Sequence, residues 1–208
     1  MTAIVDYGVG NLFSLVSSFR KIGEEAVITN DVSVIENADR IILPGVGAFR
    51  DAALKLKTSR LIPVLKAQID KGKPLMGICL GMQLLFDKSF EYGEYEGLGW
   101  ISGEIRPISD YEQNLKIPHM GWNALALRQE NHPLFKYIHN GDYVYFVHSF
   151  CGVHCEESLL ATAEYGFPVT AAVGFKNVMG CQFHPEKSGD VGLRILKAFC
   201  EMKEGSLC

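Results

Sequence analysis

The sequence predicts an α/β fold: a doubly wound, mainly parallel central sheet flanked by helices, with added antiparallel strands in the C-terminal half. Three features of the 208 residues favour this fold. In the first half, short apolar runs alternate with segments of helical periodicity, the pattern of parallel strands joined by helices. Two of these runs end in glycine-rich turns, Asp6–Gly10 and Pro44–Gly47. In the second half, short β-rich segments follow one another with Gly, Pro or Asn between them.

The first half is expected to contain four strands and their connecting helices. Apolar residues recur at helical spacing after the first strand, and a turn stops the third strand at Pro44. The strands are expected at 3–5, 26–28, 41–43 and 74–78, with helices at 12–22 and 60–71. Ligands bind outside the carboxyl ends of strands in such sheets, so the turns at Pro44 and Cys79 are expected to be neighbours or near neighbours along one edge.

The second half is expected to add antiparallel strands that extend or flank the sheet. They are expected at 101–107, 120–127, 142–147, 158–164, 169–175 and 178–183, before a closing helix that contains Leu193, Ile195, Leu196 and Phe199. The chain has no internal repeat, low-complexity segment or clear linker. A single domain over residues 1–208 is therefore expected.

The composition excludes several classes of protein. With 48% apolar and 21% charged residues, the chain resembles an ordinary globular protein that buries a sizeable core. The net charge is -4 and no Lys/Arg-rich block occurs, which argues against a nucleic-acid partner. No run of 18 apolar residues could span a membrane, and the first residues lack the pattern of a signal peptide. A cytoplasmic location is expected.

The six cysteines are interpreted as reduced thiols rather than a disulfide framework, because no secretory signal accompanies them. They occur at positions 79, 151, 155, 181, 200 and 208. The segment from Cys151 to Cys155, with His154, lacks a second ligand pair at zinc-finger spacing. An ordinary strand or loop is the better interpretation, and no metal site is expected.

Cys79 differs from the other cysteines because Gly77 and Gly81 frame it in the stretch GICLGMQLL (77–85). A sharp strand-to-helix turn forces strained backbone angles, and small neighbours avoid clashes there, as in the G-x-S-x-G turn of hydrolases. The start of a helix also favours a thiolate, and its first N–H groups, that of Leu80 in particular, can face an oxyanion. A packed structural cysteine remains the alternative.

A base and an oxyanion turn complete the predicted chemistry. In the stretch His184-Pro185-Glu186, read as extended, the first and third side chains share a face, so the carboxylate can orient the imidazole. The turn Pro44-Gly45-Val46-Gly47 can offer peptide N–H groups to an oxyanion. Taken alone, the His184-Pro185-Glu186 segment could be a surface His–Glu pair, and the Pro44–Gly47 segment could be a plain β-α turn.

Six motifs in order together resemble the class I glutamine amidotransferases, over nearly the whole chain. They are DYGVGN (6–11), PGVGAF (44–49), GICLGMQLL (77–85), PHMGWN (118–123), YFVHS (145–149) and GCQFHPEKS (180–188). The framed cysteine and the HPE segment are specific to this class. The PGVGAF and PHMGWN motifs are most similar to the glutaminase subunits of imidazole glycerol phosphate synthases, of histidine biosynthesis. The resemblance implies a flavodoxin-like arrangement of the sheet and no cofactor.

The resemblance implies a role for each matching residue. Cys79 would be the nucleophile, His184 the general base and acid, and Glu186 its orienter. The N–H groups of Leu80 and, after a peptide flip within Gly45-Val46-Gly47, of Val46 would hold the oxyanion. The amino-acid end of L-glutamine would bind Gln83 and the backbone of His148, Ser149 and Phe150. Phe150 departs from the family pattern, which often has Tyr there, so a hydroxyl contact would be lost.

The resemblance also implies a partner. Ammonia would pass through a tunnel into a separate (β/α)₈ barrel cyclase, with which this chain would form a heterodimer. The cyclase would convert phosphoribulosyl-formimino-AICAR ribonucleotide to imidazole glycerol phosphate and AICAR ribonucleotide. Asn11, Met120, Trp122 and Asn123 are the predicted docking residues, although Met120 fits a core strand equally well. By contrast, Gly8-Val9-Gly10 is an ordinary tight turn rather than a dinucleotide fingerprint, because Phe13 occupies the third glycine position.

Three alternatives remain open at the level of sequence. A related amidotransferase could supply ammonia to another synthase. A non-catalytic docking subunit could use the same fold, although the intact set of Cys79, His184 and Glu186 argues against it. A free-standing cysteine hydrolase is the third alternative, and the docking segment argues against that one.

Overall fold

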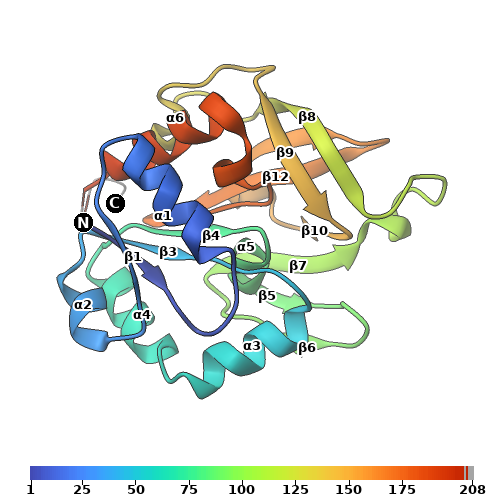
Figure 1. Cartoon of the computed structure of the whole chain (residues 1–208). Coiled ribbons are helices and arrows are strands. Elements are labelled where there is room, and N and C mark those ends of the chain that lie inside the picture. The colour runs from blue at the N-terminus through green and yellow to red at the C-terminus, as the bar shows by residue number, and fades with distance from the viewer. Residues whose placement is uncertain (204, 206–208) are drawn as a thin grey trace.

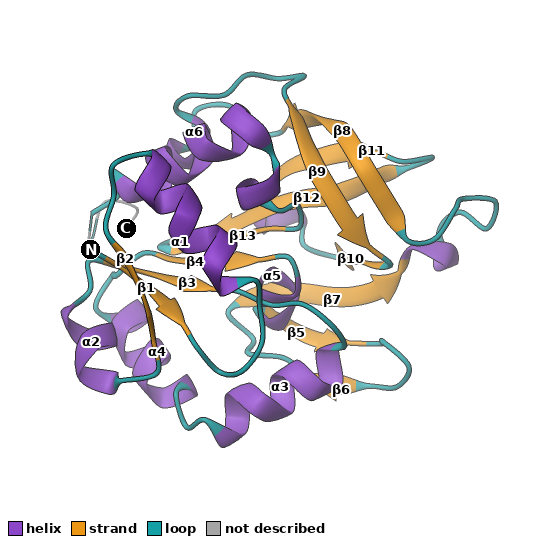
Figure 2. Ribbon diagram, in the orientation of Figure 1, coloured by secondary structure: helices purple, strands orange, loops and turns teal. Residues whose placement is uncertain are grey.

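The computed structural model describes residues 1–203 and 205, and in them a nine-stranded central sheet carries helices on both faces (Figures 1 and 2). The strand order is β2-β1-β3-β4-β13-β12-β11-β8-β9. The five strands from β2 to β13 are parallel: β1 (Thr2–Val5), β2 (Ala26–Thr29), β3 (Arg40–Leu43), β4 (Leu75–Ile78) and β13 (Val178–Cys181). The other four continue the sheet antiparallel: β8 (His119–Leu127), β9 (Tyr143–His148), β11 (Leu159–Glu164) and β12 (Pro168–Phe175). The predicted fold class is confirmed.

Alternation along the parallel strands sends successive side chains to opposite faces of the sheet. On one face Ile4 and Ile42 pack with Phe19 of α1 (Leu12–Lys21) and Phe199 of α6 (Gly189–Cys200). On the other face Ala3, Val5 and Ile41 pack against three further helices. These are α2 (Val32–Asn37), α3 (Phe49–Thr58) and α4 (Ile62–Asp70). Burial on both faces explains why these strands read as continuous apolar runs.

A second, four-stranded sheet lies beside the first and has the order β10-β7-β5-β6. Its strands are β5 (Phe86–Ser89), β6 (Tyr95–Glu96), β7 (Ile101–Pro107) and β10 (Phe150–Val153). Only β7 was predicted. Short 3-10 turns complete the chain: η1 (Ile108–Asp110), η2 (Pro133–Phe135), η3 (Glu156–Ser158) and η4 (Pro185–Lys187).

One strand differs from the prediction in a way that matters for the site. Segment 178–183 was expected to be antiparallel, but β13 pairs parallel with β4 and antiparallel only with β12. The register aligns Leu43 with Gly77 and Ile78 with Cys181. The residues that follow β3, β4 and β13 therefore leave the sheet side by side at one edge. The turns at Pro44 and Cys79 are neighbours, as expected. The end of β13 lies beside them and was not expected there.

The helices of the described residues are short, and none is both long and apolar enough to cross a membrane.

Candidate active site

Cys79 occupies a strained turn between β4 and α5 (Leu80–Leu84). Its backbone has φ 54° and ψ −113°, a left-handed φ that residues with a side chain rarely adopt. The Cys79 N–H donates to the carbonyl of Cys181 at 2.8 Å, and its own carbonyl accepts from Gln83 N–H at 3.1 Å. The side chain is 7% exposed. The predicted sharp strand-to-helix turn is confirmed.

Glycine is required on both sides of this turn because α5 crosses the ends of β3 and β4 in backbone contact. A Cβ added to Gly81 would lie 1.9 Å from the carbonyl oxygen of Leu43, and one added to Gly77 would lie 2.6 Å from the carbonyl oxygen of Gly81. A Cβ on Gly45 would lie 2.6 Å from the Gly81 nitrogen. The glycines therefore bring the Pro44–Gly47 turn directly against the first turn of α5.

His184 and Glu186 form a buried pair beside Cys79. His184 Nδ1 lies 2.8 Å from Glu186 Oε1, and the two side chains are 3% and 2% exposed. The extended backbone that was expected for this segment is wrong, because Pro185–Lys187 form the 3-10 turn η4. The pair forms nonetheless, since His184 remains extended and its N–H is held by the carbonyl of Tyr145 in β9 at 2.9 Å.

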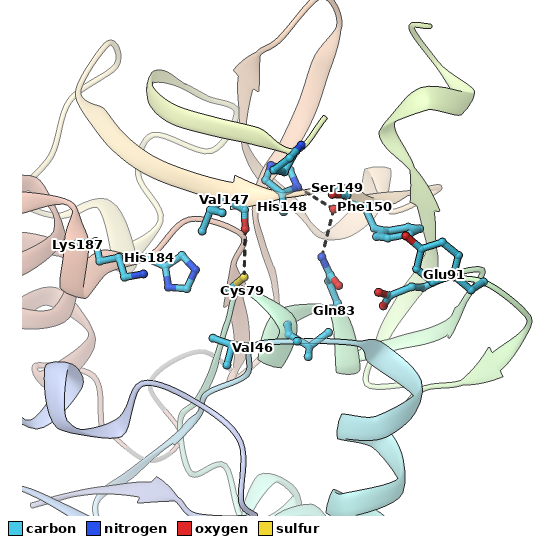
Figure 3. A pocket seen from close by; sticks show the side chains of 14 residues that line it. Val46, Cys79, Gln83, Glu91, Val147, His148, Ser149, Phe150, His184 and Lys187 are labelled. Carbon is cyan, nitrogen blue, oxygen red and sulfur yellow. Dashed lines mark hydrogen bonds between the residues drawn. The ribbon is translucent and has the colours of Figure 1, made fainter. Parts of the chain in front are cut away.

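The His184 ring points toward Cys79 (Figure 3). Burial lowers the pKa of His184, but interactions with Cys79 and Glu186 outweigh it and raise the pKa to about 9. The proton on the ring is thus stabilised between sulfur and carboxylate. This is the arrangement that an imidazole needs to protonate a leaving group.

Cys79 opens into a pocket of about 340 Å³. Most of the predicted substrate residues line it, together with several residues that were not predicted. The lining comprises Val46, Gly47, Cys79, Leu80, Gln83, Glu91, Tyr92, Pro118, Val147, His148, Ser149, Phe150, His184 and Lys187. Gly45 is absent from the lining and acts through its contact with α5 instead.

Gln83 points across the pocket toward Phe150 (Figure 3). Its Nε2 donates to the Phe150 carbonyl at 3.2 Å and to Gln182 Oε1 at 2.9 Å. Both amide protons are therefore used within the protein, and the Gln83 carbonyl oxygen is the group left for a ligand. The Phe150 ring contacts Tyr92 edge-on, with ring centroids 5.8 Å apart, while its carbonyl makes the polar contact.

Two of the residues that were not predicted make hydrogen bonds at the site. Gln182 is fully buried and donates from Nε2 to Cys79 Sγ at 3.7 Å. Its place follows from the parallel pairing of β13 with β4, which the sequence did not reveal. Glu91 lies in the pocket wall and accepts from the Phe49 N–H at 2.6 Å, and burial raises its pKa despite that hydrogen bond. It falls in a loop without periodicity, so nothing in the sequence singled it out.

The four predicted docking residues do not share one face. Met120 and Trp122 are 59% and 51% exposed on one side of β8. Asn123, next along the strand, points to the other side. Its Oδ1 lies 2.8 Å from His119 Nε2, and its Nδ2 donates a hydrogen bond to the carbonyl of Glu164. Asn11 is exposed in the turn before α1. Phe13, which was not predicted, is 84% exposed beside it.

The remaining described cysteines are buried and free: Cys151, Cys155, Cys181 and Cys200. Cys208 lies outside the described residues. Within residues 1–203 and 205, no three His, Cys, Asp or Glu side chains are grouped so that they could hold a metal ion.

Comparison with known proteins identifies the family. The model of the glutamine amidotransferase class-I family matches residues 3–202. This chain belongs to that family. It is 48% identical over 199 residues to "Imidazole glycerol phosphate synthase subunit HisH" of Lactococcus lactis, covering 95% of this chain and 96% of the relative. The protein of the same name from Caldanaerobacter subterraneus is 48% identical over 203 residues, with 97% and 98% covered.

Solved structures of other amidotransferases have the same fold as this one. "Structure of PurLQS from Thermotoga maritima" superposes with a TM-score of 0.76 at 19% identity, covering 96% of both chains. "Crystal structure of glutamine amidotransferase" gives a TM-score of 0.73 at 18% identity, covering 95% of this chain and 98% of that chain. At 18–19% identity, the similarity to these two structures shows the fold alone.

Proposed function

We propose that this chain is the glutaminase subunit of an imidazole glycerol phosphate synthase and hydrolyses L-glutamine to glutamate and ammonia through a thioester on Cys79. The observation that carries the proposal is the meeting of Cys79, His184 and Glu186 at one edge of the sheet, inside a pocket with room for an amino acid. The names of the close relatives support the identity of the synthase.

The first half-reaction forms the thioester. The Cys79 thiolate attacks the side-chain carboxamide carbon of glutamine, and the resulting oxyanion is held by the Leu80 N–H and, after a peptide flip, by the Val46 N–H. Leu80 is the first residue of α5, so its N–H has no acceptor within the helix. His184 then donates its proton to the leaving nitrogen, the C–N bond breaks, and ammonia departs.

The second half-reaction releases glutamate. His184, now neutral, takes a proton from water as the water attacks the thioester carbon. Collapse of the second oxyanion breaks the C–S bond and regenerates the thiolate beside the imidazolium. Glu186 stabilises that cation in both halves through its contact with Nδ1 at 2.8 Å.

The pocket supplies groups for the amino-acid end of the substrate. The free carbonyl oxygen of Gln83 and the carboxylate of Glu91 are acceptors for the α-ammonium group. The backbone of His148, Ser149 and Phe150 lies across the pocket from them, where it can receive the α-carboxylate. Because the Phe150 contact uses backbone, Phe serves there without a hydroxyl.

The ammonia is proposed to enter a separate (β/α)₈ barrel cyclase, which closes the imidazole ring of imidazole glycerol phosphate and releases AICAR ribonucleotide. The exposed Asn11, Met120 and Trp122 provide the docking surface. We expect the isolated chain to be a poor glutaminase that the partner and its ligand stimulate. The Pro44–Gly47 turn, in which Gly47 has φ 92°, offers a backbone that can switch its N–H direction.

The deciding experiment compares glutamine and ammonia as nitrogen sources for the complex of this chain with its cyclase. Cys79→Ala should abolish glutamine-dependent synthesis and leave ammonia-dependent synthesis intact. Loss of both would make Cys79 a structural residue. Full glutamate release by the isolated chain, without the partner, would refute the proposed stimulation.

A further inference from the structure

A chain of hydrogen bonds joins two buried histidines of neighbouring strands to the substrate pocket. His119 of β8 and His148 of β9 are register partners, and His119 Nδ1 lies 2.9 Å from His148 Nε2. His148 Nδ1 lies 2.7 Å from the Phe150 carbonyl oxygen. At the other end, His119 Nε2 lies 2.8 Å from Asn123 Oδ1, and Asn123 Nδ2 donates to the Glu164 carbonyl at 2.8 Å.

Counting protons along this chain limits the arrangements of the ring protons. Both ends are carbonyl oxygens, which only accept. Each neutral histidine, like the Asn123 amide, offers one donor and one acceptor to its neighbours. The chain thus has four contacts and three protons. One of the four contacts is therefore left without a proton. Because the Phe150 carbonyl only accepts, its contact at 2.7 Å is a hydrogen bond when the His148 proton is on Nδ1, and His148 Nε2 is then free to accept from His119 Nδ1.

In that arrangement the contact left without a proton is the one between His119 Nε2 and Asn123 Oδ1. One additional proton there would complete the chain and make His119 an imidazolium. Burial opposes this charge: it lowers the pKa of His119, and that of His148 to about 3. The other titratable groups near the pair are His184, whose charge further disfavours a proton on His148, and Tyr165, whose ring stacks on His119 at 3.9 Å. The resting pair is therefore neutral.

We propose that His119 is a positioning residue of the glutamine pocket: it holds the Nδ1–H tautomer of His148, which fixes the Phe150 carbonyl and, through it, the amide of Gln83. The proposal rests on the proposed glutaminase function. The Phe150 carbonyl accepts from both His148 and Gln83, so its direction determines where the Gln83 carbonyl oxygen points. His119 itself lines no part of the pocket and is fully buried.

The rings around His119 allow a clean substitution. His119 lies between Tyr165 and Phe146, with centroids at 3.9 and 4.8 Å and interplanar angles near 20°. Phenylalanine keeps an aromatic ring for this stacking and removes both nitrogens, at the cost of a slightly larger ring. Glutamine loses the stacking but can still donate an N–H toward His148. The pair His119→Phe and His119→Gln therefore separates packing from hydrogen bonding.

The test measures steady-state glutaminase kinetics of the complex with its cyclase for the wild type, both variants and His132→Asn. His132 is a half-buried histidine remote from the pocket lining, and Asn preserves its acceptor for the Leu134 N–H. His119→Phe should raise KM for glutamine about tenfold, as expected for a lost hydrogen bond, with kcat within about threefold. His119→Gln should recover most of that loss, and alkylation of Cys79 by iodoacetamide should proceed at the wild-type rate in both.

Two results would overturn the inference and leave the proposed function standing: a wild-type KM in His119→Phe, or an equal rise in both variants. An inactive wild type would instead refute the proposed function. Should His119→Phe fail to fold, imidazole ¹⁵N spectra of the wild type decide the matter alone. They should show protons on Nδ1 of both His119 and His148, and a proton on Nε2 of His148 would refute the assignment.

Discussion

Cys79 combines a strained backbone with a donor on each side of its sulfur. The turn that strains it follows the last residue of β4 and places the side chain against Gln182 and His184. A positive φ at a residue with a side chain costs on the order of 1–3 kcal/mol, which the surrounding backbone contacts must offset. The strain accompanies the position of the Cys79 sulfur beside Gln182 and His184, which the proposed nucleophilic role requires.

The protonation of His184 gives the first prediction. Its pKa is raised from 6.5 to about 9, so the associated stability is fully present below pH 6.5 and is lost as the pH rises through 9. Cys79→Ser removes the sulfur, whose hydrogen bond and charge interaction with His184 contribute to the rise, and the His184 pKa should then fall. NMR titration of the ring measures this directly. An unchanged pKa in Cys79→Ser would mean that Glu186 alone holds the proton.

Glu91 gives the second prediction, because a carboxylate in the pocket should bind the substrate ammonium. Glu91→Gln keeps an oxygen acceptor for the Phe49 N–H and removes the charge. KM for glutamine should rise roughly tenfold to a hundredfold, with little change in kcat, as for the loss of a charge-assisted hydrogen bond. Glu94→Gln, on the same loop but exposed beside Lys88, is the control and should behave as wild type. A wild-type KM in Glu91→Gln would mean that this carboxylate does not bind glutamine and serves only as the acceptor for the Phe49 N–H at the start of α3.

At the scale of elements, the site is the convergence of three parallel strand ends. β3 delivers the Pro44–Gly47 turn, β4 delivers Cys79, and β13 delivers Gln182 and His184. The antiparallel strand β9 adds the Tyr145 carbonyl, which holds the His184 N–H, and His148. Groups that lie between Pro44 and His184 in the sequence are thereby brought together by two strand pairings.

The third prediction concerns the contact of α5 with β3. Gly81→Ala would place a Cβ 1.9 Å from the Leu43 carbonyl, where both groups are backbone and cannot move independently. We expect a loss of roughly 3 kcal/mol in the free energy of unfolding and loss of activity. Gly174→Ala is the matched control, because its Cβ would come closest to the flexible end of the Leu160 side chain, at 2.8 Å, and would meet His132 Nε2 at an ordinary 3.4 Å. Equal stability of the two variants, measured by denaturant unfolding, would contradict the proposed close packing.

The sequence predicted this convergence incompletely. Strong apolar runs located the parallel strands of the first half, and the closing helix lies where its apolar spacing placed it. Helix α3 was missed because its buried residues are Phe49, Ala52 and Leu56, and the exposed Leu54 adds an apolar residue outside that helical spacing. Strands β5 and β6 were missed because Asp87, Lys88 and Glu96 interrupt any apolar run, and β10 was missed because Gly152 divides its four residues.

The pairing of strands that are distant in the sequence was also not predicted. The strand at 178–183 was located, but its parallel partner β4 lies about a hundred residues away, and no local pattern specifies such a pairing. For that reason Gln182 was not expected beside Cys79. The contact of His184 with Glu186 was predicted from an extended backbone, whereas the structure makes it across a 3-10 turn.

At the scale of the whole molecule, the antiparallel strands β8 and β9 bring residues to the same edge of the sheet at which the parallel strands end. β13, β11 and β9 run in one direction, so β9 ends and β8 begins at the edge where Cys79 lies. Asn11, which follows β1, belongs to that edge too. The exposed side chains of Phe13, at the start of α1, and Met120, at the start of β8, therefore lie toward this same edge, and Trp122 lies two residues further along β8.

This arrangement gives the last prediction, on docking of the cyclase. Trp122→Ala should weaken the complex at least tenfold, because large aromatic residues dominate binding at interfaces. Phe175→Ala is the control: Phe175 is 53% exposed, like Trp122 at 51%, but it ends β12 at the opposite edge of the sheet. Its loss should change the dissociation constant, measured by titration calorimetry, by less than twofold. Glutamate release by the isolated Trp122→Ala chain should equal that of the wild type, since Trp122 lines no part of the pocket. Equal weakening by both substitutions would place the partner elsewhere on the molecule.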